Sequence, residues 1–271
     1  MKSENWKNNN LFKALLLIII AWVILAIIFG FTDLEISKAF VDREALWGII
    51  GKDYGEPPGH VLWVCCLVVL IGTIIGKDDI KKQKIFSYVL IILTILAFVV
   101  GLIIGQEDLM IYGAFISVGL TLFTLITRDQ DWNNYKKFAI IVILLVIINP
   151  LIFVQVIKTF AGRVRFNSLT PPDYLEYTPW FIFNGITGHK SFPSGHTAMG
   201  WMLLPLLILV RDKEWNDPVK ILTWIGVMGW GFFVGLSRIV QGAHYASDVL
   251  FSTAFAFIIM IVLYWKFYSN E

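Results

Sequence analysis

The sequence predicts an all-α protein that crosses a membrane about eight times as a bundle of helices. Of its 271 residues, 57% are hydrophobic and only 15% are charged, and the mean hydropathy is +0.72. Soluble domains carry roughly 25% charged residues, because their surface needs polar cover. The hydrophobic residues are also gathered in runs close to the roughly 20 residues that a helix needs to cross a bilayer. These two observations exclude an ordinary soluble domain.

Each predicted span is an apolar run bounded by charged or turn-forming residues. The first run is too long for the core of a signal peptide and no small-residue cleavage site follows it, so we expect a retained span. The sixth run is short, but it can extend back through Ser194, Gly195 and His196. The eight predicted spans are Leu11–Phe31, His60–Gly76, Ile85–Gly105, Leu109–Thr127, Phe138–Ile157, Thr197–Val210, Ile221–Ser237 and Asp248–Trp265.

Lysine and arginine predict the orientation of these spans. If both termini are cytoplasmic, most of the 22 lysine and arginine residues fall in inner segments, which is the bias that membrane proteins show. The segment between the first and second spans carries Ile36, Phe40 and Trp47 at near-helical spacing. This spacing fits an amphipathic helix along the membrane interface, and an ordinary loop fits it equally well.

Three polar segments interrupt the apolar sequence, and in the eight-span arrangement all three lie at the outer face. They are residues 158–166, 191–196 and 237–248. Together they supply fixed cations, two histidines and a carboxylate, which are the groups that phosphoryl transfer without a metal requires. Cations and backbone N–H groups stabilise the phosphoryl oxygens. A histidine can attack phosphorus, a carboxylate can orient that histidine, and a second histidine can protonate the leaving oxygen.

The spacing within the segments suits these tasks. His244 and Asp248 are four residues apart, so on a helix they share one face. Lys158 and Arg165 are seven residues apart; if their segment is helical they share a face about 10 Å apart, and both can reach one phosphate. Ser194 opens the sixth run and is a good candidate for a helix N-cap.

The three segments resemble the signature of the type 2 phosphatidic acid phosphatase superfamily, which includes membrane lipid phosphatases, undecaprenyl diphosphate phosphatases and soluble acid phosphatases. The resemblance covers residues 158–248, and the rest of the chain matches only as hydrophobic spans. Its motifs are Lys158-x6-Arg165, Pro193-Ser194-Gly195-His196 and Ser237-Arg238-x5-His244-x3-Asp248.

The resemblance implies a six-helix core, to which this chain would add two helices, and it implies a metal-independent enzyme without a cofactor. It implies that His244 is the nucleophile, Asp248 its orienting partner and His196 the general acid. In one departure from the family pattern, Phe166 follows Arg165 where proline is usual, which removes a rigid turn from the loop but no charged contact. The implied phosphate-binding residues are Lys158, Arg165, Ser194, Gly195 and Arg238.

Other interpretations of these residues are weaker. A zinc site made of His196, His244 and Asp248 would lack the paired-ligand spacing of such sites. Arg163 lies five residues from Lys158 and is interpreted as a charge at the membrane interface. A transporter would place polar groups in the middle of several spans, and the first five are almost free of them. A catalytically silent scaffold would lack the histidines.

We therefore predict a single integral membrane phosphatase domain over residues 1–271, N-in and C-in, that hydrolyses a phosphomonoester or diphosphate of a lipid through a phosphohistidine. The active site is expected at the outer face of a prokaryotic plasma membrane. The expected partners are a lipid phosphate and the bilayer, and the net charge of +2 gives no sign of a nucleic acid. The alternatives are an undecaprenyl diphosphate phosphatase, a lipid phosphate transferase using the same intermediate and, more distantly, a transporter. The identity of the lipid and the oligomeric state are left open.

Overall fold

The computed structural model describes residues 2–268, with side chains from residue 10 onward, and every regular element in this range is a helix. Among the described residues, seven helical segments are long and apolar enough to cross a membrane, and an eighth apolar segment, Gly195–Leu209, is shorter. The predicted class, an all-α polytopic bundle, is confirmed. The count of eight spans and the orientation stay predictions. The chain divides into two compact units, one made of the parts before Glu56 and after Leu144, the other of Glu56–Leu144.

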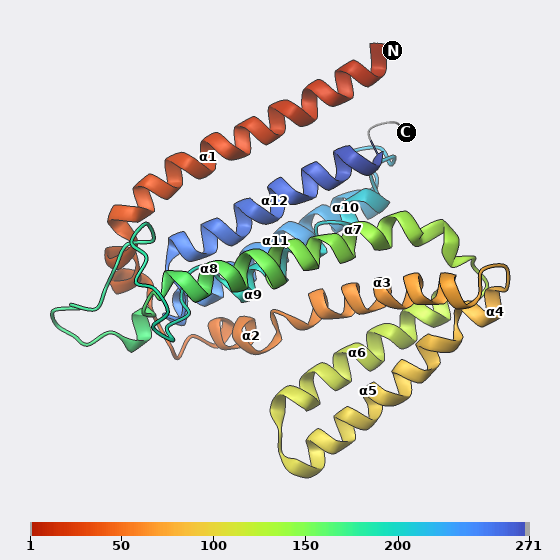
Figure 1. Ribbon diagram of the computed structural model, residues 1–271, viewed down its shortest axis with the longest axis horizontal. Helices are drawn as coiled ribbons and strands as arrows, with labels where there is room; N and C mark the ends of the chain where they lie inside the picture. The colour runs from red at the N-terminus through yellow and green to blue at the C-terminus, as the bar shows by residue number, and fades with distance from the viewer. Residues whose placement is uncertain (1, 269–271) are drawn as a thin grey trace. The chain divides into compact units, whose positions relative to one another are not determined.

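The first unit is made of the helices that come before Glu56 and after Leu144 in the sequence. They are α1 (Lys2–Phe40), α2 (Leu46–Tyr54), the π-helical turn η2 (Ile147–Phe153), α8 (Val154–Ala161), η3 (Phe166–Ser168), α9 (Gly195–Gly200), η4 (Trp201–Leu203), α10 (Leu206–Leu209), α11 (Pro218–Val240) and α12 (Ala246–Tyr268). Helix α1 packs along α12, and α11 packs against α2 and α9 (Figure 1). Trp201, Leu204, Val227 and Ala256 form the buried centre of this unit.

Two helices of the first unit depart from the predicted spans. Helix α1 continues to Phe40, nine residues past the predicted end, and α2 follows at Leu46. The segment that fitted both a helix and a loop is therefore helical except at residues 41–45, and Trp47 lies on a different helix from Ile36 and Phe40. The predicted sixth span is broken into α9, η4 and α10, with Pro205 just before α10. Proline has no N–H to donate, so it interrupts the hydrogen bonds of a continuous helix.

Helix α8 ends because of one glycine, and this end matters for the site. Gly162 has a φ of 54°, in the left-handed region that glycine adopts without strain. A Cβ atom at this position would lie 2.3 Å from the carbonyl oxygen of Gly185, so a side chain has no room. The chain therefore leaves the helix axis after Ala161 and enters the long loop that leads to α9.

The second unit contains a helical hairpin. Helices α5 and α6 pack against each other, and Gly105, with a φ of 68°, ends α5. Gly101 and Gly113 let the two backbones approach, since a Cβ at Gly113 would lie 2.7 Å from the backbone nitrogen of Phe98. The elements of this unit are α3 (Pro57–Ile75), α4 (Ile80–Gln83), α5 (Ile85–Ile104), α6 (Glu107–Ile126), η1 (Trp132–Tyr135) and most of α7 (Lys136–Val146).

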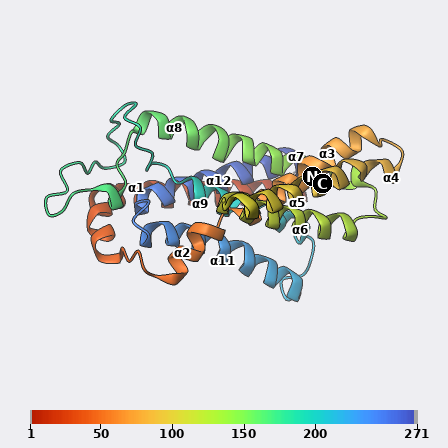
Figure 2. The same cartoon turned by 90° about the horizontal axis from the view of Figure 1, so that it is seen from below.

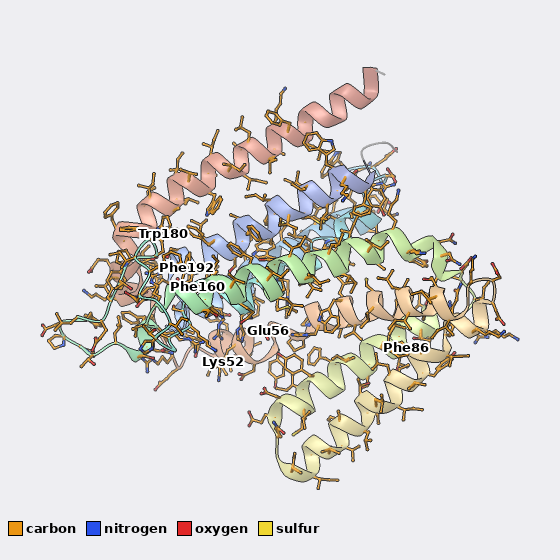
Figure 3. All side chains as sticks on the ribbon, viewed as in Figure 1. Lys52, Glu56, Phe86, Phe160, Trp180 and Phe192 are labelled. Atoms are coloured by element: carbon orange, nitrogen blue, oxygen red, sulfur yellow. The ribbon has the colours of Figure 1, made fainter. Side chains whose placement is uncertain are left out.

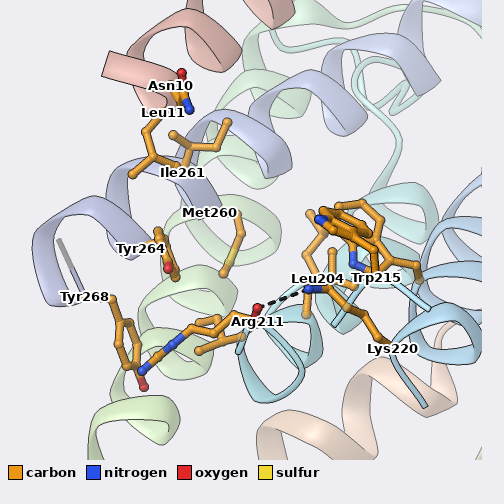
Figure 4. A pocket seen from close by; sticks show the side chains of 13 residues that line it. Asn10, Leu11, Leu204, Arg211, Trp215, Lys220, Met260, Ile261, Tyr264 and Tyr268 are labelled. Atoms are coloured by element: carbon orange, nitrogen blue, oxygen red, sulfur yellow. Dashed lines mark hydrogen bonds between the residues drawn. The ribbon is translucent and has the colours of Figure 1, made fainter. Parts of the chain in front are cut away.

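A cavity of about 530 Å³ lies in the first unit, between the start of α1 and the end of α12 (Figure 4). Its walls are mostly apolar, and the Nζ atom of Lys220 on its rim donates to the carbonyl oxygen of Arg211. Tyr264, which lines it, is roughly 24 Å along α12 from Asp248, at a rise of about 1.5 Å per residue. The cavity is thus separate from the polar segments.

The packing of α11 on Trp201 predicts one large effect on stability. A Cβ at Gly231 would lie 2.3 Å from the Trp201 ring, which is 1% exposed and held by a 2.8 Å hydrogen bond from its Nε1 to Thr253. We expect Gly231→Ala to destabilise the protein by about 1–3 kcal/mol, the usual cost of overpacking, and to lower its Tm in detergent.

Gly229 on the same helix is the matched control. A Cβ there has no neighbouring heavy atom within 4 Å, so Gly229→Ala gains helix propensity without a clash. Its Tm is expected to equal or exceed that of the wild type. Equal melting temperatures for Gly231→Ala and Gly229→Ala would contradict the tight packing of Trp201 on α11.

Candidate active site

The three polar segments meet at one end of the first unit, where α8 and α11 end and α9 and α12 begin (Figures 1 and 2). The backbone N–H of Ser194 donates to the carbonyl oxygen of Asp248 at 3.1 Å, and the Ser252 hydroxyl donates to the carbonyl oxygen of Ser194 at 2.7 Å. The N–H of Ser191 donates to the carbonyl oxygen of Arg163 at 3.0 Å. Backbone hydrogen bonds therefore join all three segments.

The third segment forms a tight turn between α11 and α12. Gly242 has a φ of 63°, and the N–H groups of Ala243 and His244 donate to the carbonyl oxygen of Arg238 at 3.1 and 3.2 Å. Helix α12 begins at Ala246, so His244 lies two residues before it. The turn holds His244 close to the first turn of a helix whose free N–H groups favour a negative charge.

His244 is held by a buried carboxylate. Its Nδ1 atom lies 3.3 Å from Asp248 Oδ2, and the two side chains are 1% and 0% exposed. The same oxygen accepts hydrogen bonds from the Tyr245 N–H at 3.0 Å and from the Ser191 hydroxyl at 2.5 Å. With the Nδ1 proton directed at the carboxylate, Nε2 carries the lone pair of the neutral ring. The carboxylate therefore orients His244 so that its Nε2 atom can act as a nucleophile or as a base.

Cations surround this histidine. Lys158 and Arg238 both act electrostatically on His244. The Nζ atom of Lys158 would lie 3.2 Å from a Cβ built at Gly195, so the lysine reaches over the second segment. In that segment, the Ser194 hydroxyl accepts from the Thr197 N–H at 3.3 Å, as expected of an N-cap, and the half-buried His196 follows two residues later. The chain thus gathers both histidines, two cations and Gly195 in one place.

Arg165 does not share a helix face with Lys158, so that expectation is wrong. Helix α8 ends at Ala161 because Gly162 adopts a left-handed conformation, and Arg165 lies beyond the turn. Arg165 is half-buried. The residues after it return to the third segment, since the N–H of Asn167 donates to the carbonyl oxygen of Gly242 at 2.9 Å. Phe166, at the position of the usual proline, packs edge-on against Tyr245 with ring centroids 6.5 Å apart.

Arg163 is not an interface charge, contrary to its interpretation from the sequence. It is 1% exposed, and its guanidinium contacts Asp248 Oδ1 at 2.6 Å and Asp33 Oδ2 at 3.0 Å. The guanidinium also lies 3.9 Å from the ring centroid of Tyr245. A burial this complete is stable only because both carboxylates pair with the cation.

Asp33 was not among the predicted site residues. It is 0% exposed on α1, and it accepts hydrogen bonds from both the N–H and the hydroxyl of Ser247 as well as from Arg163. Its sequence position gave one usable signal, because a carboxylate at the end of an apolar run is costly unless it has a buried partner. The partner itself is 130 residues away and no local pattern indicates it.

Aromatic side chains close this end of the unit. Trp180 and Phe192, labelled in Figure 3, have ring centroids 6.3 Å apart, and each also contacts Phe251 of α12. The Trp180 indole N–H donates to the carbonyl oxygen of Ala26 at 2.8 Å, which ties the long loop to α1. Tyr177 packs against Tyr245 with centroids 5.5 Å apart. Tyr177 and Tyr245 also cover the Arg163 guanidinium, which lies 5.6 and 3.9 Å from their ring centroids.

Burial sets the charge state of His244. It lowers the pKa of this imidazole to about 3, with Lys158 and Arg238 lowering it further and the contact with Asp248 opposing the shift. A histidine in an unfolded chain has a pKa of about 6.5. Because the folded pKa is depressed, His244 contributes its full stability above about pH 6.5, and that contribution is lost as the pH falls toward the folded value.

The downward shift of the His244 pKa predicts a measurable dependence of stability on pH. Between pH 6.5 and 4.5 the unfolded chain takes up a proton at this histidine and the folded protein does not. We expect the stability of the wild type, relative to His244→Gln, to fall by about 2 kcal/mol over this interval. Unfolding of both proteins in the same detergent at each pH measures the difference. A difference that stays constant would show that His244 titrates alike in both states.

Residues 137–271 match the model of the PAP2 superfamily and include all three polar segments. The chain belongs to the PAP2 superfamily. This is the type 2 phosphatidic acid phosphatase superfamily that the motifs resemble, so that prediction is confirmed. No solved structure matches this PAP2 chain significantly.

The relatives of this PAP2 chain include phosphatases of bacterial lipids. It is 28% identical over 166 residues to a lipid A 4′-phosphatase of Francisella tularensis subsp. novicida, covering 58% of this chain and 71% of the relative. It is 32% identical over 89 residues to phosphatidylglycerophosphatase B of Haemophilus influenzae, covering 31% and 36%. It is 35% identical over 107 residues to a lipid A 1-phosphatase of Porphyromonas gingivalis, covering 39% and 20%. The similarity thus spans well under half of the last two relatives.

Proposed function

We propose that this PAP2 protein is a membrane-embedded lipid phosphatase that works through a phosphohistidine on His244. The observation that carries the proposal is the buried His244–Asp248 pair, with Nδ1 and Oδ2 3.3 Å apart, beside Lys158 and Arg238. A neutral, oriented imidazole next to two cations suits attack on a phosphate, since the cations offset the charge that otherwise repels a nucleophile. The family and its lipid phosphatase relatives support the same chemistry.

The proposed reaction has two steps. Nε2 of His244 attacks phosphorus, the bond between phosphorus and the lipid oxygen breaks, and His196 gives its proton to that oxygen. Asp248 stabilises the positive ring that carries the phosphoryl group. Water then attacks phosphorus, the P–N bond breaks, and His196 takes back a proton, so that inorganic phosphate leaves and the enzyme returns to its first state.

The phosphate-binding residues are proposed on the same basis. Lys158 and Arg238 act on His244, and Gly195 leaves room for the lysine. Ser194 caps the short helix that carries His196. Arg165 is proposed to contact the phosphate from the loop rather than from a helix, since its segment returns to the Gly242 turn. Such a set of donors neutralises the equatorial oxygens as their charge redistributes.

The proposed substrate is a phosphomonoester or diphosphate of a membrane lipid, reached at the outer face of the plasma membrane. The named relatives act on lipid A and phosphatidylglycerophosphate, so these two substrate classes come first. The orientation rests on the bias of lysine and arginine toward the inner segments. Aromatic rings around the site, such as Trp180 and Phe192, would flank a lipid tail.

Phosphate release from a panel of lipids tests the proposal. Purified full-length protein in detergent is given phosphatidic acid, phosphatidylglycerophosphate, lipid A and undecaprenyl diphosphate, each with and without EDTA. We expect release from at least one lipid, unchanged by EDTA, because the proposed nucleophile is a histidine rather than a metal-bound water. No release from any lipid would contradict a phosphatase, and a loss with EDTA that zinc restores would contradict the metal-free mechanism.

A further inference from the structure

Asp33, Arg163 and Asp248 form a buried cluster behind the proposed nucleophile. Arg163 lies between the two carboxylates, 2.6 Å from Asp248 Oδ1 and 3.0 Å from Asp33 Oδ2, and all three side chains are at most 1% exposed. Ser247 completes the cluster, since its hydroxyl donates to Asp33 and accepts from the Arg163 guanidinium at 2.9 Å. Of these three residues, only Asp248 has a role in the proposed reaction. The presence of Asp33 and Arg163 therefore needs a separate explanation.

The contacts divide the two oxygens of Asp248 between separate partners. Oδ1 faces Arg163, whereas Oδ2 faces His244, the Tyr245 N–H and the Ser191 hydroxyl. A carboxylate whose two oxygens are held from opposite sides loses its freedom to rotate. Arg163 itself is fixed, because its Nε donates to the carbonyl oxygen of Thr178 at 2.8 Å. The position of Oδ2 opposite His244 therefore depends on Arg163.

Charge explains why a second carboxylate is present. The guanidinium of Arg163 is always charged, and beside Asp248 alone it would cancel most of the negative field that the carboxylate exerts on His244. Asp33 pairs with the other end of the same guanidinium and leaves the cluster with one net negative charge. That charge favours the positive ring that forms when His244 carries a phosphoryl group.

The helix that carries Asp33 is attached to the catalytic segments at further points. Just after α1, the Asp42 N–H donates to the carbonyl oxygen of Val240 at 2.9 Å, and the Arg43 guanidinium donates to the carbonyl oxygen of Asn167 at 3.0 Å. Both partners flank the site. Helix α1 lies outside residues 137–271, the part that matches the family model. The N-terminal helix thus supplies a charged group to a site whose motifs all lie elsewhere.

We propose that Asp33 is a positioning residue for the reaction, acting through Arg163 on the orientation and charge of Asp248, and that α1 is therefore part of the catalytic assembly. This inference rests on the proposed function. The change that tests it is Asp33→Asn, which keeps the size of the side chain and removes its charge. Glu35→Gln is the matched control, because Glu35 lies two residues away on the same helix and is exposed, with an ion pair to Lys38 at 2.9 Å.

The experiment measures kcat and KM for phosphate release, with the concentration of folded enzyme set by the burst of phosphoenzyme. We expect Asp33→Asn to lower kcat by about 10- to 100-fold, as for other groups that orient a catalytic side chain. Its KM should change by less than about threefold. Glu35→Gln should have the kcat and KM of the wild type. An active wild type with an unchanged kcat for Asp33→Asn would overturn the inference. A wild type inactive on every lipid would instead overturn the proposed function.

A second variant separates charge from mere structure. If Asp33 acts through Arg163, Asp33→Asn should cause no further loss of kcat in a protein that already carries Arg163→Gln, so the double variant should be no slower than Arg163→Gln alone. A purely structural role predicts that the double variant is slower than either single variant, and that result would overturn the inference. Should Asp33→Asn not fold, Ser247→Ala removes only the hydroxyl between Asp33 and Arg163. It is expected to lower kcat several-fold, and an unchanged kcat would again overturn the inference.

Discussion

His244→Ala is expected to lower the rate of phosphate release by at least about 1,000-fold, because it removes the group that attacks phosphorus. The binding residues remain in this variant. We therefore expect a loss in kcat, measured on the best lipid of the panel, with a much smaller change in lipid binding.

The same variant tests the intermediate directly. Wild-type protein mixed with a lipid labelled in its phosphate should carry label on the protein, stable in base and lost in acid as a phosphohistidine is. His244→Ala should carry none. His60→Ala is the control, because His60 lies in the second unit, where its ring accepts a hydrogen bond from Trp63 at 3.1 Å. Labelling of His244→Ala at the level of the wild type would remove this histidine from the mechanism.

The sequence was sufficient for those parts of the site that depend on local spacing. His244 and Asp248 are four residues apart, and Ser194 stands where an N-cap belongs, so their contacts with each other or with the nearby backbone follow from short-range geometry. The apolar runs predicted the helices for the same reason. Local patterns carry this information because the partners lie within one or two helical turns.

The sequence-based predictions that were wrong or missing concern features that depend on tertiary contacts or on a single backbone angle. The pair of Asp33 and Arg163 joins residues 130 positions apart, and each residue alone has the pattern of a charge at a span end. The expected face shared by Lys158 and Arg165 was wrong because Gly162 turns the chain after Ala161. That glycine was a usable signal for a helix end, since glycine commonly follows the last helical residue.

The end of α1 shows that a charged residue after an apolar run can be either exposed or buried and paired. The predicted span stopped at Phe31 because Asp33 and Glu35 follow it, and charges are costly inside a membrane helix. Glu35 is exposed, in agreement with that argument, but Asp33 is 0% exposed and paired. The helix continues to Phe40 because its charged positions fall on different faces, one toward the site and one away from it.

His196→Ala is expected to lower kcat by about 100- to 10,000-fold, the range over which general acids act. His196 follows the N-cap Ser194 at the start of α9, and Ser194 is joined to Asp248 by a 3.1 Å backbone hydrogen bond. This bond ties the segment that carries His196 to the segment that carries His244 and Asp248. If its task is to protonate the leaving oxygen, the loss should depend on how much the leaving group needs that proton.

Two substrates with different leaving groups distinguish proton donation by His196 from binding or positioning of the phosphate. In an analogue of the lipid with sulfur in place of the bridging oxygen, the leaving group is a thiolate. A thiolate needs a proton far less than an alkoxide does, because a thiol, with a pKa of about 8.5, is much more acidic than an alcohol. Formation of the phosphoenzyme by His196→Ala should be strongly slowed with the oxygen ester and nearly normal with the sulfur ester. His189→Ala, an exposed histidine seven residues earlier, should behave as the wild type with both. Equal slowing of His196→Ala on the two substrates would mean that His196 binds or positions the phosphate rather than donating a proton, because the sulfur ester differs from the natural lipid only at the atom that the proton would reach.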